Sequence, residues 1–274
     1  MTGVQTCALP IFIDSDVFIY RAANRAQTTF DWGEGPQTNL DEAASMLDLT
    51  KQVTDIQDLL NAENIIMALG DPDGKNWRKD ILPSYKAHRK PEDKPKLLSF
   101  LREFVLKTWK TYQRPTLEGD DVLGILSTAP DLIRGEKIIV SIDKDFQSIP
   151  GHLYNPDHPE RGTRLISHDQ ADYYHAYQTL IGDATDGYKG CPGIGPKKAT
   201  GILGPITKAE YWKAIVATYE AKGLTEADAL VQARVARICR DGDYDRTKKQ
   251  VILWTPPVTE ESPIHQHNSA GETQ

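Results

Sequence analysis

The sequence has few cysteines and no long apolar run. Its three cysteines, Cys7, Cys191 and Cys239, are too few and too widely spaced for a disulfide framework or a zinc site. We therefore expect a reducing, cytoplasmic setting. No apolar segment is long enough to cross a bilayer, and the N-terminus lacks the basic start of a signal peptide. These absences argue against a disulfide-rich, zinc-binding or membrane protein.

Positive charge is also in short supply. The chain has 32 Lys and Arg against 39 Asp and Glu, which gives a formal net charge of −7. Such a balance is unusual for a nucleic-acid-binding protein, but the distribution of charge matters more than the total. Residues 75–96 carry eight basic residues against three acidic ones. This stretch could follow a phosphate backbone, although basic runs are more often ordinary solvated surface.

Apolar runs separated by helical patterns indicate the fold class. Residues 11–13, 64–69 and 137–142 predict buried strands. Helical spacing predicts helices over residues 17–26, 97–111, 121–132, 167–181, 211–219 and 225–240, the fourth opened by a capping box at Ser167. Alternating strands and helices predict an α/β fold with a mainly parallel central sheet flanked by helices. The length of 274 residues allows this core and a small, helical C-terminal unit.

Acidic residues follow the predicted strands or begin helices. Asp14, Asp71 and Asp143 each come directly after a strand, and the carboxyl ends of parallel strands meet at one edge of a sheet. The remaining clustered acids are Glu118, Asp120, Asp121, Asp145, Asp183 and Asp186. One such pair alone is more often a helix cap or a turn. Several independent clusters favour a metal site, because unpaired carboxylates repel one another unless a cation joins them. Mg²⁺ prefers oxygen ligands, and two such ions could activate a water and hold a phosphate for cleavage.

A glycine-rich segment at residues 190–199 looks like a helix-hairpin-helix. Gly193 and Gly195 allow close approach of the backbone to a phosphate, and the helix that follows offers free N–H groups. Lys197 and Lys198 add positive charge. Contacts of this kind position DNA without reading its sequence. The alternative is an ordinary glycine turn before a helix.

With these segments in view, the chain resembles the 5′-nuclease (flap endonuclease) superfamily, and most of all its stand-alone phage 5′→3′ exonucleases. The resemblance covers about residues 11–250. Its most specific parts are Leu-Glu-Gly-Asp-Asp at 117–121, Ile-Asp-Lys-Asp-Phe at 142–146 and Gly-Asp-Ala-Thr-Asp-Gly-Tyr at 182–188. The resemblance implies a PIN-like 5′-nuclease fold with a helix-hairpin-helix subdomain. It also implies hydrolysis of DNA phosphodiester bonds by a two-metal-ion mechanism, from a 5′ end or at a flap.

The resemblance also implies roles for single residues. The ion that activates the attacking water would be held by Asp14, Asp71, Glu118 and Asp120, with Asp121 adjacent, and the second ion by Asp143, Asp145, Asp183 and Asp186. Lys86 and Arg89 would grip the scissile phosphate. Tyr20 and Arg21 lie where the family stacks an aromatic on the terminal base, with core packing as the alternative for Tyr20.

We accordingly expect four segments. Residues 1–10 are an artefactual leader, 11–175 a nuclease domain with a basic helical arch at about 75–115, 176–254 the helix-hairpin-helix subdomain, and 255–274 a disordered tail. The expected cofactors are two Mg²⁺ ions, replaceable by Mn²⁺, and K⁺ at the hairpin. The expected partners are DNA with a free 5′ end, flap or nick, RNA in RNA–DNA hybrids, and replication proteins in trans. We expect a monomer without membrane contact, in the cytoplasm of a bacterial or phage-infected cell.

Two other functions remain open. A PIN-type ribonuclease also uses clustered acids on a similar sheet, but normally lacks the long basic arch and the hairpin. A non-catalytic, structure-specific DNA-binding protein would have lost one or more of the carboxylates, and none is lost here.

Overall fold

The computed structural model describes residues 9–257, apart from Trp32 and Glu34. The predicted leader (1–10) and tail (255–274) therefore lie largely outside the described residues. The two described residues of the leader belong to the fold, since Leu9 packs against the core and the carbonyl of Pro10 accepts a hydrogen bond from Ile138 N at 3.0 Å.

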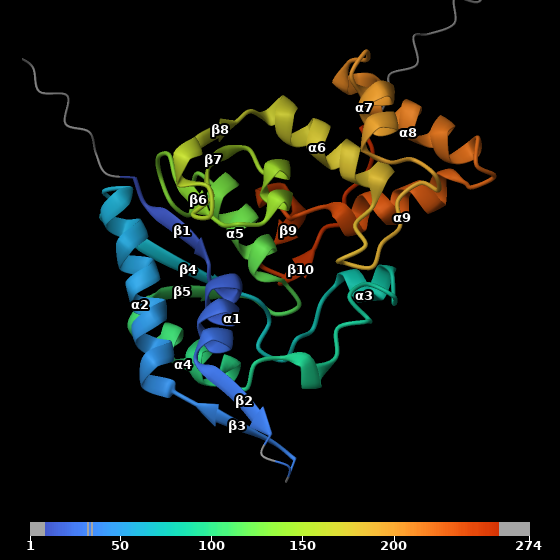
Figure 1. The fold of residues 1–274 in the computed structure, drawn as a ribbon. Coiled ribbons are helices and arrows are strands. Elements are labelled where there is room, and N and C mark those ends of the chain that lie inside the picture. Colours follow the sequence, from blue (N-terminus) through green and yellow to red (C-terminus); the bar gives the residue numbers. More distant parts are fainter. Residues whose placement is uncertain (1–8, 32, 34, 258–274) are drawn as a thin grey trace, which may run out of the picture.

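The centre of the molecule is a six-stranded sheet (Figure 1). Its strands lie in the order β5 (Lys110–Gln113), β4 (Ile65–Leu69), β1 (Ile11–Asp14), β6 (Ile138–Val140), β7 (Gly151–Tyr154) and β8 (Arg164–Ile166). All neighbours are parallel except β7 and β8, which are antiparallel. The three predicted strands are the three central ones, and the predicted mainly parallel sheet is confirmed.

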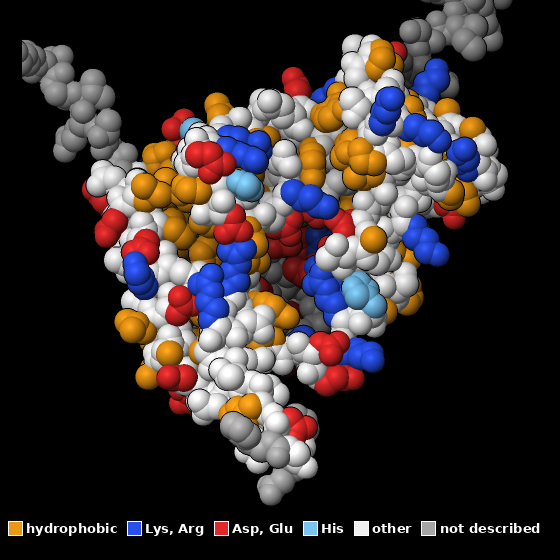
Figure 2. Space-filling model, viewed as in Figure 1, with side chains coloured by type: hydrophobic (Ala, Val, Ile, Leu, Met, Phe, Trp, Pro, Cys, Tyr) orange, Lys and Arg blue, Asp and Glu red, His pale blue; other side chains and the backbone are white. Residues whose placement is uncertain are grey.

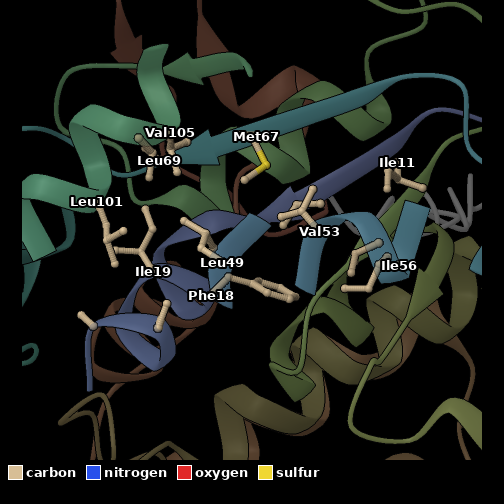
Figure 3. Packing of buried hydrophobic residues seen from close by; sticks show 14 of the residues in the cluster. Ile11, Phe18, Ile19, Leu49, Val53, Ile56, Met67, Leu69, Leu101 and Val105 are labelled. Carbon is tan, nitrogen blue, oxygen red and sulfur yellow. The ribbon is translucent and has the colours of Figure 1, made fainter. Parts of the chain in front are cut away.

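Helices cover both faces of this sheet because the central strands are apolar on both sides. Side chains alternate between the faces of a strand. Ile11 and Ile13 point to one face, where α1 (Ser15–Arg25), α2 (Glu42–Leu59) and α4 (Leu98–Thr108) pack (Figure 3). Phe12 points to the other face, where it meets α5 (Gly119–Thr128). Burial on both faces is why these strands read as continuous apolar runs.

The second unit is helical and has a core of its own. It contains α6 (His168–Ile181), α7 (Pro196–Leu203), α8 (Tyr211–Glu220) and α9 (Glu226–Ala236). Ser167 caps α6 through the predicted capping box with Gln170. The predicted boundary at 175/176 falls inside α6, because Ala171 packs in the core of the sheet domain and Leu180 in the helical core. One helix thus joins the two units, and the predicted C-terminal helical subdomain is present.

The predicted helical arch needs correction. After α3 (Arg78–Ile81), residues 82–97 are loop and turns with one short 3-10 turn, Pro91–Asp93. The helix that follows, α4, buries Leu101 and Val105 in the core, and β5 joins the sheet. Apolar packing therefore draws residues 98–113 into the domain body, although the start of α4 still lines the cleft, and the basic loop at residues 82–97 is not a helical arch.

Two further strand pairs lie outside the sheet. An antiparallel hairpin, β2 (Gln27–Asp31) and β3 (Pro36–Leu40), projects from the body next to α1 (Figure 1). A short pair, β9 (Tyr244–Asp245) and β10 (Gln250–Val251), follows α9. Within the described part of the chain, every helix is too short or too polar to span a bilayer.

Candidate active site

A cleft of about 1030 Å³ opens between the carboxyl edge of the sheet, the basic loop and the start of the helical unit. Figure 2 shows an acidic floor at the bottom of this hollow, with basic side chains on both walls. The lining includes Asp14, Asp71, Glu118, Asp120, Asp143, Asp145, Asp183 and Asp186, together with Lys86 and Arg89. Of the nine acids singled out in the sequence, eight line this cleft.

The three central strands deliver the first acids. Since β4, β1 and β6 are neighbours, Asp14, Asp71 and Asp143 arrive at the same edge, as their positions after the strands predict. Ser141, which the sequence analysis did not single out, links two of them. Its Oγ donates to Asp14 Oδ2 at 2.7 Å and accepts from Asp143 N at 3.0 Å. The sequence does contain a signal for Ser141, since it is a small polar residue inside an apolar run, two positions before an acid.

Asp71 shapes the turn after β4. Its Oδ1 accepts from the backbone N–H groups of Asp73 and Lys75, and its Oδ2 accepts from Thr116 N at 2.7 Å. These backbone donors outweigh partial burial and hold the pKa of Asp71 below its usual value. A carboxylate has about four acceptor positions, so Oδ2 keeps one for a ligand in the cleft.

The prediction that Asp121 joins the metal ligands is wrong. Asp121 is fully buried beneath the cleft, where it forms a buried ion pair with Arg78 at 2.8 Å. It also accepts hydrogen bonds from Trp77 Nε1 at 2.9 Å and Cys239 N at 3.0 Å. Both oxygens are thus taken by the protein. This carboxylate ties α5 to α3 and to the segment after α9.

A second group of acids stands where the sheet domain meets the helical unit. Asp143 and Asp145 follow β6, and Asp183 and Asp186 follow α6. The Oδ1 atom of Asp145 is buried and has no hydrogen-bond partner among the described residues. Asp183 pairs with Lys144 at 2.7 Å, and this contact, with a hydrogen bond from Thr185 N, lowers its pKa against the opposing effect of burial.

Close backbone contact fixes the loop that carries Asp183 and Asp186. Gly182 and Gly190 have φ of +69° and +63°, and a Cβ on either would lie 2.3 Å from backbone atoms of the other strand of the loop. Only glycine permits this approach. Between them Asp183 and Tyr188 exchange backbone hydrogen bonds at 2.8 and 3.1 Å, so the loop is a tight, paired structure.

Lys86 lies between the two acidic groups. Its ammonium contacts Glu118 Oε1 at 2.6 Å and Asp186 Oδ2 at 3.4 Å. Arg89 contacts Asp186 at 2.8 Å. The hydroxyl of Tyr85, which the sequence analysis did not assign, lies 2.8 Å from Glu118 Oε2 and 3.1 Å from Asp186 Oδ2. The basic loop therefore joins two groups of carboxylates. The first group is Asp14, Asp71, Glu118 and Asp120, and the second is Asp143, Asp145, Asp183 and Asp186.

Charge and burial pull the pKa values of these acids apart. Burial, reinforced by neighbouring carboxylates, raises the pKa of Asp14 and of Asp145 to about 7. The same causes raise the pKa of Asp120 well above its ordinary value. Glu118 is also desolvated, but Lys86 and Arg78 outweigh this effect and lower its pKa to about 2. The floor of the cleft therefore carries acids that need a cation to ionise fully at neutral pH.

The predicted DNA-binding residues lie at two places. Tyr20 lines the cleft with 44% of its surface exposed, whereas Arg21 is engaged by Asp157 through two hydrogen bonds of 2.7 and 2.6 Å. The hairpin residues are exposed on the helical unit: Gly193 and Gly195 lie in the loop before α7, and Lys197 and Lys198 lie in its first turn. Lys198 donates to the carbonyl of Gly193 at 2.8 Å.

An acidic floor at the edge of a parallel sheet, with cations placed to meet a phosphate, defines a phosphodiester-cleaving nuclease. Comparison with known proteins agrees with this class. Residues 10–160 match the family model of the 5′-3′ exonuclease N-terminal resolvase-like domain. The chain belongs to this 5′-3′ exonuclease family.

Individual relatives extend the match over most of the chain. The chain is 33% identical over 226 residues to the exodeoxyribonuclease of Enterobacteria phage T3, covering 69% of this chain and 73% of the relative. It is 29% identical over 283 residues to the exonuclease of Escherichia phage T7, covering 90% and 93%. In fold it is similar to a bacteriophage T5 flap endonuclease solved with DNA and metal ions, with a TM-score of 0.54, 16% identity and coverage of 82% of this chain and 89% of that chain.

Proposed function

We propose that this 5′-nuclease hydrolyses DNA phosphodiester bonds at or near a free 5′ end, using two Mg²⁺ ions held by the two groups of carboxylates. One observation carries the proposal. Eight acids from separate segments line one cleft, and the cations Lys86 and Arg89 lie directly against them. The T5 relative's complex with DNA and metal ions supports the same use of the cleft here.

The donor set fits divalent cations. All the acids offer oxygen, which Mg²⁺ prefers, and the buried Oδ1 of Asp145 has no partner among the described residues. Yet no three acidic, histidine or cysteine side chains among those residues already form a ready-made metal shell. Glu118 and Asp186 now hold Lys86 and Arg89, so to serve as metal ligands they would have to loosen these ion pairs.

Within this proposal the basic loop exchanges partners. When bound, divalent ions supply Lewis-acid activation of water and of the phosphate. Once the charges of Glu118 and Asp186 are neutralised, Lys86 and Arg89 can turn to the oxygens of the scissile phosphate. Lys86 then offsets the negative charge that develops during cleavage. Tyr20 lies on the cleft wall, where it can stack on the terminal base.

The hairpin would bind the duplex part of the substrate at a second place, outside the cleft. Exposed Gly193, Gly195 and Lys197 at the start of α7 can meet phosphates through backbone N–H groups and charge. The Lys198 ammonium on the Gly193 carbonyl already places one cation on this hairpin, and K⁺ binding there is part of the proposal. The proposal also includes Mn²⁺ as a substitute for Mg²⁺, cleavage of RNA in RNA–DNA hybrids and a monomeric state. It further includes replication partners in trans and a phage-infected bacterial cell as the setting.

The deciding experiment is a cleavage assay with Mg²⁺ on 5′-labelled flap, nicked and blunt DNA, and on single-stranded RNA. We expect cleavage of the DNA substrates near the 5′ end and none after chelation by EDTA. RNA cleavage without dependence on a 5′ end would favour the PIN-type ribonuclease. Tight flap binding without cleavage would favour a non-catalytic DNA-binding protein.

A charge-removing variant provides the control. Asp145→Asn keeps the shape of the side chain and removes a carboxylate with a buried, unpaired oxygen. Cleavage should fall strongly while flap binding stays the same or tightens, because less negative charge faces the phosphate. Near-normal turnover in this variant would remove Asp145 from the metal site.

A further inference from the structure

Asp16 and Arg102 form an ion pair on the wall of the cleft, beside the first group of carboxylates. Asp16 lies in the first turn of α1, two residues after Asp14, and Arg102 lies on α4. Arg102 Nη1 donates to Asp16 Oδ1, and both side chains line the cleft. Neither residue is among the metal ligands or phosphate contacts proposed above.

The pair holds one residue, Gly70, by both its backbone N–H and its carbonyl. Asp16 Oδ2 accepts from Gly70 N at 2.8 Å, and Arg102 Nη2 donates to Gly70 O at 2.6 Å. Gln113 Nε2 also donates to Gly70 O at 2.6 Å. Gly70 directly precedes Asp71, so this clamp fixes the point where the chain leaves β4 and presents that carboxylate.

The same carboxylate also fits against the turn that carries Glu118 and Asp120. A Cβ on Gly119, between those acids, would lie 3.2 Å from Asp16 Oδ2, and one on Gly70 would lie 3.1 Å from it. The two turns are bonded to each other as well, since Asp71 N donates to Leu117 O at 2.8 Å. Asp16 thus occupies a narrow slot between the two turns, where a Cβ on either glycine would crowd its carboxylate.

We propose that Asp16 and Arg102 are positioning residues for the first metal site, acting through Gly70 and Gly119 on Asp71, Glu118 and Asp120. The inference rests on the proposed function for the identity of the site. It assigns the pair no contact with the metal. An Arg is needed because its planar guanidinium can reach a carboxylate and a carbonyl at once, which an ammonium on a flexible stem does poorly.

The test compares Arg102→Gln, Asp16→Asn and the double variant with wild type, in the absence of DNA. Mn²⁺ binding is measured by calorimetry, and hydrogen exchange is followed in peptides covering residues 69–76 and 115–121. We expect one Mn²⁺ site to lose about 10- to 100-fold in affinity, as is typical when a partner of a ligand is removed, with the other site unchanged. Exchange should rise in both peptides. The double variant should be no worse than either single variant, since the two residues act as one unit.

Lys107→Gln is the matched control. Lys107 lies on the same helix and pairs with exposed Glu103 at 3.4 Å, so its loss should change neither measurement. If Arg102→Gln does not fold, Arg102→Lys replaces it, because it keeps the charge. This variant should show a smaller loss of Mn²⁺ affinity and a smaller rise in exchange. Unchanged Mn²⁺ affinity and unchanged exchange in a folded variant would overturn the inference. If both measurements stay unchanged and a separate gel-shift assay shows weaker binding of flap DNA, Arg102 is a substrate contact instead.

The same experiment separates the two proposals. A wild-type protein that binds no Mn²⁺ contradicts the proposed function, while the exchange data still report whether the pair holds the two turns. A wild-type protein that binds two Mn²⁺ ions, with variants that bind them equally well, contradicts only the positioning role.

Discussion

Lys86 contacts carboxylates in this structure, and the proposed function gives it a second role at the phosphate. Its backbone is in the left-handed region, with φ of 51°, and its N–H donates to Asp186 O at 2.8 Å. A non-glycine residue pays roughly 1 kcal/mol or more for this conformation. The ammonium it places between Glu118 and Asp186 reduces the repulsion of the acidic floor. The same position puts a cation where the proposed function places the scissile phosphate.

Lys86→Ala should therefore slow the chemical step more than it weakens binding. A lost transition-state donor is typically worth about 10²–10³ in rate. We expect a drop of that size in the single-turnover rate at saturating enzyme, with a smaller change in Kd for flap DNA. Lys94→Ala, in the same basic loop but without a contact to the carboxylates, is the control and should recover full rate at saturation. If Lys86→Ala recovers as well, its role is only to attract DNA.

The raised pKa values of Asp14 and Asp145 predict that metal binding is coupled to protons. With folded-state pKa values of about 7, both keep protons that the unfolded chain loses near pH 4. Their contribution to stability is thus full below pH 4 and is lost as the pH rises through 7, when no cation is bound. Mg²⁺ must displace the remaining protons, so its affinity should rise from pH 6 to pH 8.

Melting curves with and without Mg²⁺ would measure this coupling. The increase in Tm on adding Mg²⁺ should be larger at pH 8 than at pH 6, and calorimetry in two buffers of different ionisation enthalpy should show proton release at pH 6. Asp145→Asn should reduce both effects. An increase in Tm that is independent of pH would mean that these carboxyl groups are already ionised in the metal-free protein.

At the scale of secondary-structure elements, the sequence predicts best what local patterns determine. The central strands and their terminal acids were predictable because burial on both faces leaves continuous apolar runs. The helix α2 was missed, and its exposed Leu47 and Leu59 blur the apolar stripe. The edge strands β5 and β8 are short and partly polar, so only their neighbours in the sheet define them.

The errors at the site have the same origin. Asp121 and Asp120 are adjacent in sequence, but a helix turns by about 100° per residue, so they face different surroundings. What takes Asp121 out of the cleft is Arg78, which lies 43 positions earlier in the chain. Similarly, α4 is not part of an arch as predicted, because Leu101 and Val105 pack in the hydrophobic core. Contacts between distant segments decide such cases, and one sequence does not reveal them.

The loop between α6 and α7 allows a direct test of backbone contact. Gly190 and Gly193 have similar φ, +63° and +72°, but a Cβ on Gly190 would meet backbone atoms at 2.3 Å and one on Gly193 would meet nothing within 4 Å. Both Ala variants bear the strain of positive φ, and only Gly190→Ala adds overpacking of about 1–3 kcal/mol. Urea unfolding should therefore show Gly190→Ala less stable than Gly193→Ala by that amount. Equal losses would mean that the loop opens easily and does not fix Asp183.

At the scale of the whole molecule, a net charge of −7 has to be reconciled with binding to DNA. The acids concentrate on the floor of the cleft, while basic residues stand on its walls (Figure 2) and Lys197 and Lys198 are exposed on the hairpin. Exposed charges farther apart than about 8–10 Å are largely screened at physiological salt. A bound duplex therefore responds to the charges near it and not to the total.

Two charge reversals can distinguish control of DNA binding by local charge from control by net charge, because each changes the net charge by the same two units. Lys197→Glu alters the start of α7, where we expect the duplex backbone to lie. Lys51→Glu alters α2, where the exposed Lys51 pairs with Asp55 at 2.7 Å. If local charge governs binding, Lys197→Glu alone should weaken duplex affinity, to a similar extent for different sequences, and should lower the salt dependence of log K by about one unit. Equal weakening by both reversals would show that net charge governs binding, and no effect of Lys197→Glu would contradict the assignment of the hairpin to DNA.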